Sequence, residues 1–87
     1  MADIRLFDTV KVLVKKEKRH MSHFYGYNHE RRGFVIEIDG AGYGIAVTNS
    51  RGKVVDVSYW YDRDDLTPVR TSAKKRVANL TQYEQFD

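Results

Sequence analysis

Apolar and polar residues alternate with a period of two in four separate stretches of the chain. Such alternation predicts β-strands that bury one face, because successive side chains of a strand point to opposite sides. The predicted strands cover residues 10–15, 34–39, 43–47 and 53–61. Their predicted inward positions are, strand by strand, Val10, Val12 and Val14, extended upstream by Ile4 and Leu6; Phe34, Ile36 and Ile38; Tyr43, Ile45 and Val47; and Val55, Val57, Tyr59 and Tyr61. The pattern therefore predicts a protein of the all-β class, built mainly from strands.

Turn signals separate these strands and continue after the last one. Residues 39–42 read Asp-Gly-Ala-Gly and supply the positive-φ positions of a tight hairpin. Residues 49–52, Asn-Ser-Arg-Gly, predict a second turn, so the last three long strands should form a meander. Residues 62–65, Asp-Arg-Asp-Asp, fit a single 3₁₀ turn, and residues 66–69 then fit a short closing strand.

The length of the chain, 87 residues, leaves room for one hydrophobic core, so a single domain spanning 1–87 is expected. Within it, residues 7–69 carry the strands and residues 70–87 form a C-terminal extension. A short helix capped by Thr71 or Ser72 is predicted in this extension. Its positions at helical spacing are Ala73, Val77, Leu80 and either Tyr83 or Glu84.

Four segments carry a resemblance to a known architecture: Phe7-Asp8-Thr9-Val10-Lys11-Val12-Leu13, Gly33-Phe34-Val35-Ile36-Glu37-Ile38, Tyr43-Gly44-Ile45-Ala46-Val47, and Trp60-Tyr61 with Asp65-Leu66-Thr67-Pro68-Val69. In this order, over residues 7–69, the chain resembles small SH3-like barrels of the KOW and Tudor kind. The resemblance implies a five-stranded barrel with a long first loop, a meander and a 3₁₀ turn before the last strand. It implies no particular activity, because this fold carries many unrelated functions.

Positive charge is concentrated in two places, although the net charge is only +3. Residues 15–32, the basic loop, interleave lysines, arginines and histidines with aromatic residues, and a second cluster consists of Arg70, Lys74, Lys75 and Arg76. Basic side chains neutralise phosphates and aromatic rings stack on bases, so we expect contact with nucleic acid or a nucleoprotein assembly. The predicted contact residues are Lys15, Lys16, Lys18, Arg19, His23, Tyr25, Tyr27, Arg31, Arg32 and Trp60, with the second cluster as a secondary contact.

An ordinary exposed loop would have a similar composition, with its aromatic residues folded back onto the barrel. Trp60 also supports an alternative hypothesis. It alternates with the inward positions Tyr59 and Tyr61 of its predicted strand, so its side chain should lie outside the main core. A surface made of Tyr25, Tyr27, Trp60 and Tyr61 would let the chain dock on an acidic partner protein as an adaptor or small inhibitor. Trp60 could instead pack under the C-terminal extension or, as the Tudor resemblance implies, join an aromatic cage for a methylated amine. Association into a homo-oligomer is a third hypothesis.

The sequence predicts no catalytic site and no cofactor. Cysteine is absent, and none of the four serines stands in an activating motif. The glycines of residues 40–44 precede a predicted strand instead of a helix, so they do not form a dinucleotide-binding loop. We therefore expect a non-catalytic binding module.

Metal and membrane sites are not predicted either. The histidines of residues 20–29 lie in a predicted loop, and the aspartates of residues 62–65 lack the spacing of a calcium loop. No stretch reaches the roughly 20 apolar residues that cross a bilayer, and the first residues do not read as a secretion signal. A cysteine-free chain of this kind suits a cytoplasmic location.

Overall fold

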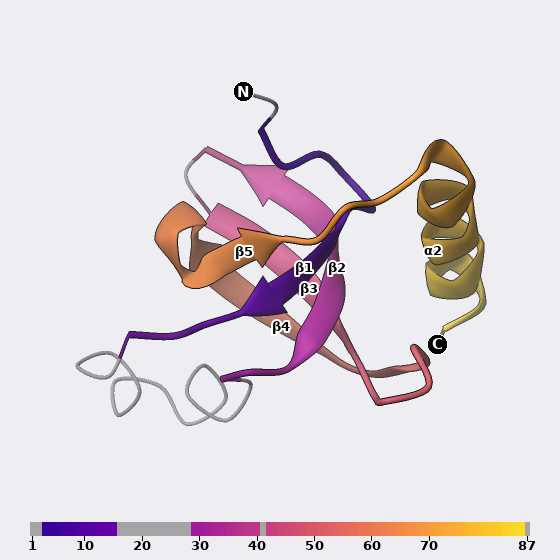
Figure 1. Ribbon diagram of the computed structural model, residues 1–87, viewed down its shortest axis with the longest axis horizontal. Helices are drawn as coiled ribbons and strands as arrows, with labels where there is room; N and C mark the ends of the chain where they lie inside the picture. The colour runs from indigo at the N-terminus through magenta and orange to yellow at the C-terminus, as the bar shows by residue number, and fades with distance from the viewer. Residues whose placement is uncertain (1–2, 16–28, 41, 87) are drawn as a thin grey trace.

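A computed structural model of the chain describes residues 3–15, 29–40 and 42–86. It contains five strands, a 3₁₀ turn and a helix, which Figure 1 shows in their arrangement. These elements are β1 (Thr9–Val12), β2 (Arg32–Asp39), β3 (Gly42–Thr48), β4 (Val54–Asp62), η2 (Arg63–Asp65), β5 (Leu66–Pro68) and α2 (Ala73–Gln85). The predicted strands, the 3₁₀ turn and the C-terminal helix are confirmed, and the protein is mainly β.

The strands form one antiparallel sheet in the order β4-β3-β2-β1-β5. Strand β1 lies between β2 and β5, since Val10 lies opposite Gly33 of β2 and opposite Pro68 of β5. Strands β2, β3 and β4 form the predicted meander, with Gly40 (φ +60°) and Gly52 (φ +78°) in its turns. Strands β4 and β5, at the two ends of the order, do not pair within the described residues. The sheet is therefore open, and the closed barrel implied by the resemblance is not confirmed.

The main core lies on one face of this sheet. All inward positions predicted for β3 and for the first stretch from Val10 onward are buried: Val10, Val12, Val14, Tyr43, Ile45 and Val47. Ile4, Val35, Tyr61 and Leu66 complete the cluster. Burying side chains of this size stabilises the fold by about 1.5–3 kcal/mol each.

The predicted parity is wrong in the first half of β2. Val35 is fully buried in the main core, whereas Phe34, expected there, lies in a second cluster on the opposite face. The pairing of β2 with β3 shifts between Val35 and Glu37, and one extra residue in a strand sends the following side chains to the other face. Ile38 therefore lies on the predicted side, opposite Tyr43 of the main core, but it is exposed. Upstream, Leu6 is also exposed instead of buried, next to the positive φ of Phe7.

Strand β4 departs from its predicted parity for the same reason. Its pairing with β3 is irregular at two places. As a result Val54 and Ser58 are buried, while Val55 and Tyr59, predicted inward, are exposed. Only Tyr61 occupies the core as predicted.

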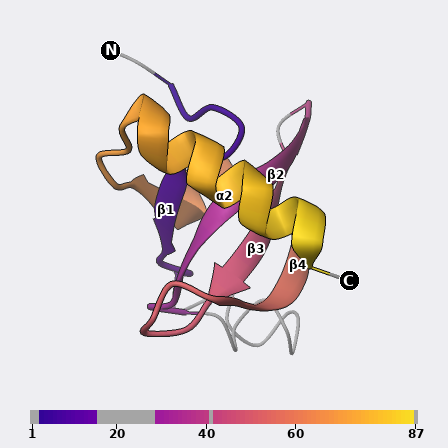
Figure 2. The same ribbon diagram turned by 90° about the vertical axis from the view of Figure 1, so that its right-hand side faces the viewer.

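Helix α2 lies across the opposite face of the sheet (Figure 2). A second buried cluster forms there from Phe34, Ala46 and Val54, with Phe7, Ile36 and Tyr83 packed against it. Gln82 ties the helix to the turn between β3 and β4. Its Oε1 accepts a hydrogen bond from the Val54 N–H at 2.7 Å, and its Nε2 donates to the Gly52 carbonyl at 3.0 Å. Both faces of the sheet are therefore covered in part, which period-two alternation does not predict.

The start of α2 agrees with the prediction. Ser72 caps the helix, because its hydroxyl accepts a hydrogen bond from the Lys75 N–H at 3.1 Å. Among the positions at helical spacing, Tyr83 packs against the second cluster, whereas Val77 is 62% exposed and Leu80 is also exposed. The polar Asn79, which the spacing does not include, is only 3% exposed.

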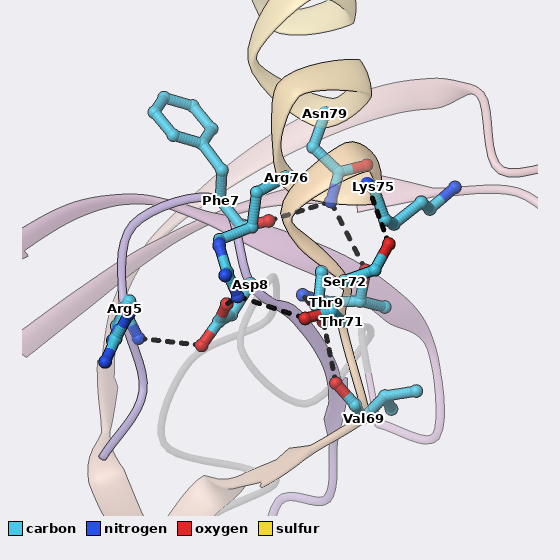
Figure 3. Close-up of polar contacts among 10 residues, drawn as sticks. All are labelled: Arg5, Phe7, Asp8, Thr9, Val69, Thr71, Ser72, Lys75, Arg76 and Asn79. Atoms are coloured by element: carbon cyan, nitrogen blue, oxygen red, sulfur yellow. Dashed lines mark hydrogen bonds and ion pairs between the residues drawn. The ribbon is translucent and has the colours of Figure 1, made fainter. Parts of the chain in front are cut away.

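Polar contacts fix α2 to the N-terminal segment (Figure 3). The Asn79 amide donates hydrogen bonds to the Phe7 carbonyl at 2.8 Å and to the Thr9 hydroxyl at 3.3 Å. One turn earlier, the Arg76 guanidinium pairs with the Asp8 carboxylate at 3.1 Å. Hydrogen bonds to defined partners orient the helix more narrowly than apolar packing would, so these contacts decide which side faces the sheet.

We expect Asn79→Ala to lower the free energy of unfolding by about 2 kcal/mol, because it leaves the Phe7 carbonyl without its hydrogen-bond donor. Urea unfolding followed by circular dichroism measures this change. Thr81→Ala, at an exposed position of the same helix, is the control and should alter stability by less than about 0.5 kcal/mol. Equal effects of the two substitutions would contradict a docking role for Asn79.

Candidate functional site

A groove of about 870 Å³ lies between three parts of the chain that are distant in sequence. Its borders are the start of β2, the turn that joins β3 to β4, and the segment that leads from β5 into α2. Figure 2 shows the turn between β3 and β4 below the helix and the segment that leads into α2 at the N-terminal end of the helix. A concave surface of this size is ordinary for a binding site.

Basic residues from two separate regions of the sequence line this groove. Arg31 and Arg32 come from the end of the basic loop, and Arg70 and Lys75 come from the second basic cluster. Glu30 is the single carboxylate among the described lining residues. In the part of the chain that the structure describes, the side chains of Arg32, Arg70 and Lys75 take part in no ion pair. The groove therefore carries an excess of positive charge available to an external anion.

The backbone at the start of β2 is held on two sides. The carbonyl of Arg31 accepts a hydrogen bond from the Val12 N–H at 2.8 Å. The carbonyl of Arg32 accepts one from the Thr48 hydroxyl at 3.1 Å. These contacts fix the backbone that carries both arginines, so that their side chains start from defined positions at the edge of the groove.

The opposite wall is the turn between β3 and β4. The Asn49 side-chain oxygen accepts hydrogen bonds from the N–H groups of Arg51 at 2.9 Å and Lys53 at 3.0 Å, which stabilises the turn. Ser50 of this turn lines the groove. Phe34 is the one aromatic residue among the described lining residues, and its ring is buried. The described residues that line the groove thus present charged and hydrogen-bonding groups to a ligand, but no exposed aromatic ring.

The predicted contact residues divide into three groups. Arg31 and Arg32 line the groove. Lys15 does not, and its ammonium lies 3.9 Å from the Asp64 carboxylate. Trp60 lies at the other end of the sheet, against Gly42 at the start of β3. The remaining predicted residues fall outside the described part of the chain: Lys16, Lys18, Arg19, His23, Tyr25 and Tyr27.

The second basic cluster is also divided by the fold. Arg70 and Lys75 line the groove, whereas Arg76 is held by Asp8. The turn residues Asn49 and Ser50 were not predicted as part of a site. The sequence of residues 49–52, which begins with asparagine and ends with glycine, predicted a turn. Only the tertiary structure shows that this turn lies across the groove from Arg31 and Arg32.

Metal binding finds no support among the residues described. No group of three histidine, aspartate or glutamate side chains is placed there to hold an ion. His29, one of the loop histidines considered as a ligand, accepts a hydrogen bond on its Nδ1 from the Val14 N–H at 3.0 Å. Its role in the structure is thus to hold the backbone beyond β1.

Several cations on an open concave surface, next to hydroxyl and amide groups, can bind phosphate groups. In the residues that the structure covers, no helix has the length and apolar character needed to span a membrane. Comparisons with protein-family models, with curated proteins and with solved structures found no match to this chain.

Proposed function

We propose that this chain is a non-catalytic binding module that contacts nucleic acid, or a nucleoprotein assembly, through the basic groove. The observation that carries the proposal is the convergence of Arg31 and Arg32 with Arg70 and Lys75 on one concave surface. Basic residues that neutralise phosphates release counterions from the polymer, and this release drives binding. Cations gathered from separate segments provide several such contacts at once.

The mode of contact in this proposal is recognition of the phosphate backbone. The buried ring of Phe34 offers no face to a base, and the arginine and lysine side chains suit phosphate oxygens. Binding through such a surface depends little on base sequence. A location in the cytoplasm, where nucleic acids are accessible, belongs to the same proposal and suits a chain without cysteine.

The proposal includes an SH3-like architecture for residues 7–69. The strand order β4-β3-β2-β1-β5 and the 3₁₀ turn η2 immediately before β5 support it. Under this proposal α2 is an addition to the SH3-like unit. It covers the outer face of the sheet and brings Lys75 to the groove.

The test is a titration with single- and double-stranded DNA and RNA at two salt concentrations, followed residue by residue by NMR. The charge-reversed variant Arg32→Glu with Arg70→Glu should bind at least about tenfold more weakly than the unmodified chain. Its salt dependence should also be less steep, by about two units in the slope of log K against log salt, because two phosphate contacts are lost.

The matched control is the single variant Arg5→Glu, which is compared with Arg32→Glu alone and changes the net charge by the same amount at an exposed position outside the groove lining. It should retain most of the affinity, since exposed charges more than about 8 Å apart are largely screened at physiological salt. Equal losses in the two single variants would show that only net charge matters. The absence of NMR shifts at the groove with every polymer would reject the proposed function.

A further inference from the structure

A surface of opposite character lies on the sheet at the end away from the groove. Two aromatic residues of β4, Tyr59 and Trp60, are each 44% exposed there. Their ring centroids are 4.9 Å apart. Three exposed carboxylates, those of Glu37 and Asp39 in β2 and Asp62 in β4, accompany them. We call these five residues the acidic aromatic patch.

Strand register places Asp39, Asp62 and Trp60 on the same face. Asp39 and Asp62 both lie directly opposite Gly42 in neighbouring strands. Residues that pair directly in an antiparallel sheet point their side chains to the same side. A Cβ atom on Gly42 would approach the Trp60 ring to 3.2 Å, so the tryptophan lies on that side too.

Gly44 defines the other half of the patch. It pairs with Glu37, and a Cβ atom added to it would overlap the Tyr59 ring and lie 3.4 Å from the Glu37 Cβ. Burial, the neighbouring Tyr83 of α2 and the Glu37 carboxylate together raise the pKa of Tyr59. The tyrosine is therefore held between the helix and the carboxylate. Gly42 and Gly44 leave space for both rings to lie close to the backbone of β3.

The patch and the groove occupy opposite ends of β3. Gly42 begins this seven-residue strand at the patch, and Thr48 ends it at the groove. At about 3.3 Å per residue the two ends are roughly 20 Å apart. This separation exceeds the Debye length of about 8 Å at physiological salt, so the opposite charges do not cancel each other. The two surfaces can therefore bind independently.

The side chains of the patch suit a cation. Within the described residues Glu37 and Asp39 form no ion pair, so their charge is available to an external group. The face of a tryptophan or tyrosine ring attracts lysine and arginine, tryptophan most strongly. Tryptophan and tyrosine also supply much of the binding energy in protein interfaces. Carboxylates around exposed rings repel a nucleic acid and attract a basic protein.

We propose that the acidic aromatic patch docks a lysine- or arginine-rich segment of a partner protein. The adaptor hypothesis from the sequence had an acidic partner protein. The patch is itself acidic, so the partner proposed here is basic. Tyr61, included in that hypothesis, is fully buried and takes no part. The domain would then hold a basic protein at one end of the sheet, whatever occupies the groove at the other.

The test uses the fluorescence of Trp60, which is the only tryptophan of the chain and reports on the patch directly. The probe is a short peptide of alternating lysine and glycine, and the control probe has glutamate in place of lysine. We expect a saturable change of Trp60 emission with the lysine peptide alone. A change that does not saturate, or one of equal size with both peptides, would overturn the proposal.

Matched variants separate the patch from general charge effects. Glu37→Gln with Asp39→Asn should weaken binding of the lysine peptide about fivefold. Asp56→Asn with Asp64→Asn removes the same charge outside the patch and outside the groove lining, and should weaken it less than about twofold. If the two variants weakened binding of the lysine peptide equally, that result would contradict the assignment of the site to the patch. Heteronuclear NMR spectra of each variant establish that the fold is retained.

Two further results keep this proposal distinct from the groove. The Arg32→Glu, Arg70→Glu variant should bind the lysine peptide no more weakly than the unmodified chain. Glu37→Gln with Asp39→Asn should leave any nucleic-acid binding unchanged. A change of Trp60 emission with protein concentration alone would show that a second copy of the chain occupies the patch, and would overturn the assignment to a partner protein.

Discussion

A chain that ends at Val69 is expected to lose its folded structure, because α2 covers a face of the sheet that is too apolar to be exposed. Phe34 and Val54 would lose the packing of the helix. The Phe7 carbonyl and the Val54 N–H would lose the side chains that satisfy them. Dispersion of the amide signals in a proton–nitrogen NMR spectrum measures the outcome, together with far-ultraviolet circular dichroism.

The size of this effect follows from the contacts removed. The four hydrogen bonds that Asn79 and Gln82 make contribute about 1 kcal/mol each. Partial exposure of two large apolar side chains adds at least about 1.5 kcal/mol more. The sum, about 5 kcal/mol or more, is comparable with the whole stability expected for a small domain.

The control for the truncation is a chain that ends at Gln85, the last residue of α2, which should remain folded. A folded chain ending at Val69 would contradict the structural role assigned to the helix. Even then it should bind nucleic acid more weakly, because Arg70 and Lys75 would be absent from the groove.

Tyr61→Ala is expected to destabilise the protein by about 3–5 kcal/mol, the usual cost of removing a large aromatic side chain from a core. Tyr61 is fully buried in the main core, among residues of β1, β2 and β3. Its hydroxyl donates a hydrogen bond to the Ser58 hydroxyl at 3.0 Å. The free energy of unfolding in urea measures the loss, if the variant still folds without denaturant.

Tyr61→Phe separates the two contributions of this residue. It keeps the ring and removes the hydroxyl, so it should cost only about 1 kcal/mol, with the Ser58 hydroxyl losing its partner. If Tyr61→Ala and Tyr61→Phe destabilised the protein equally, packing of the ring would contribute little. That result would contradict the position of Tyr61 in the core.

The two proposed surfaces explain why net charge alone describes this protein poorly. A formal charge of +3 is compatible with an even distribution, yet the fold separates cations and carboxylates along β3. The groove gathers Arg32 and Arg70, while the patch presents Glu37 and Asp39. Such a division suits a module that brings an anionic polymer and a basic protein together.

Local sequence determined much of the fold. The alternation in Val10–Val14 and in Tyr43–Val47 placed each core residue correctly, because these strands keep a regular pleat. The turns at Gly40 and Gly52 followed from the need for positive φ. A cap at Thr71 or Ser72 followed from the unpaired N–H groups at a helix start, and the structure assigns it to Ser72. All of these are short-range effects that a window of a few residues contains.

The tertiary structure alone decided where the register shifts and what the helix and the charges meet. The irregularities in β2 and β4 depend on the neighbouring strand, so alternation could not place Val35 or Val55. The side of α2 that faces the sheet was decided by Asn79, whose partners lie 70 or more positions earlier in the chain. Likewise, Arg32 meets Arg70 only because β1 pairs with both β2 and β5. Contacts between segments that are distant in sequence form only when the whole chain packs, so local propensities cannot predict them.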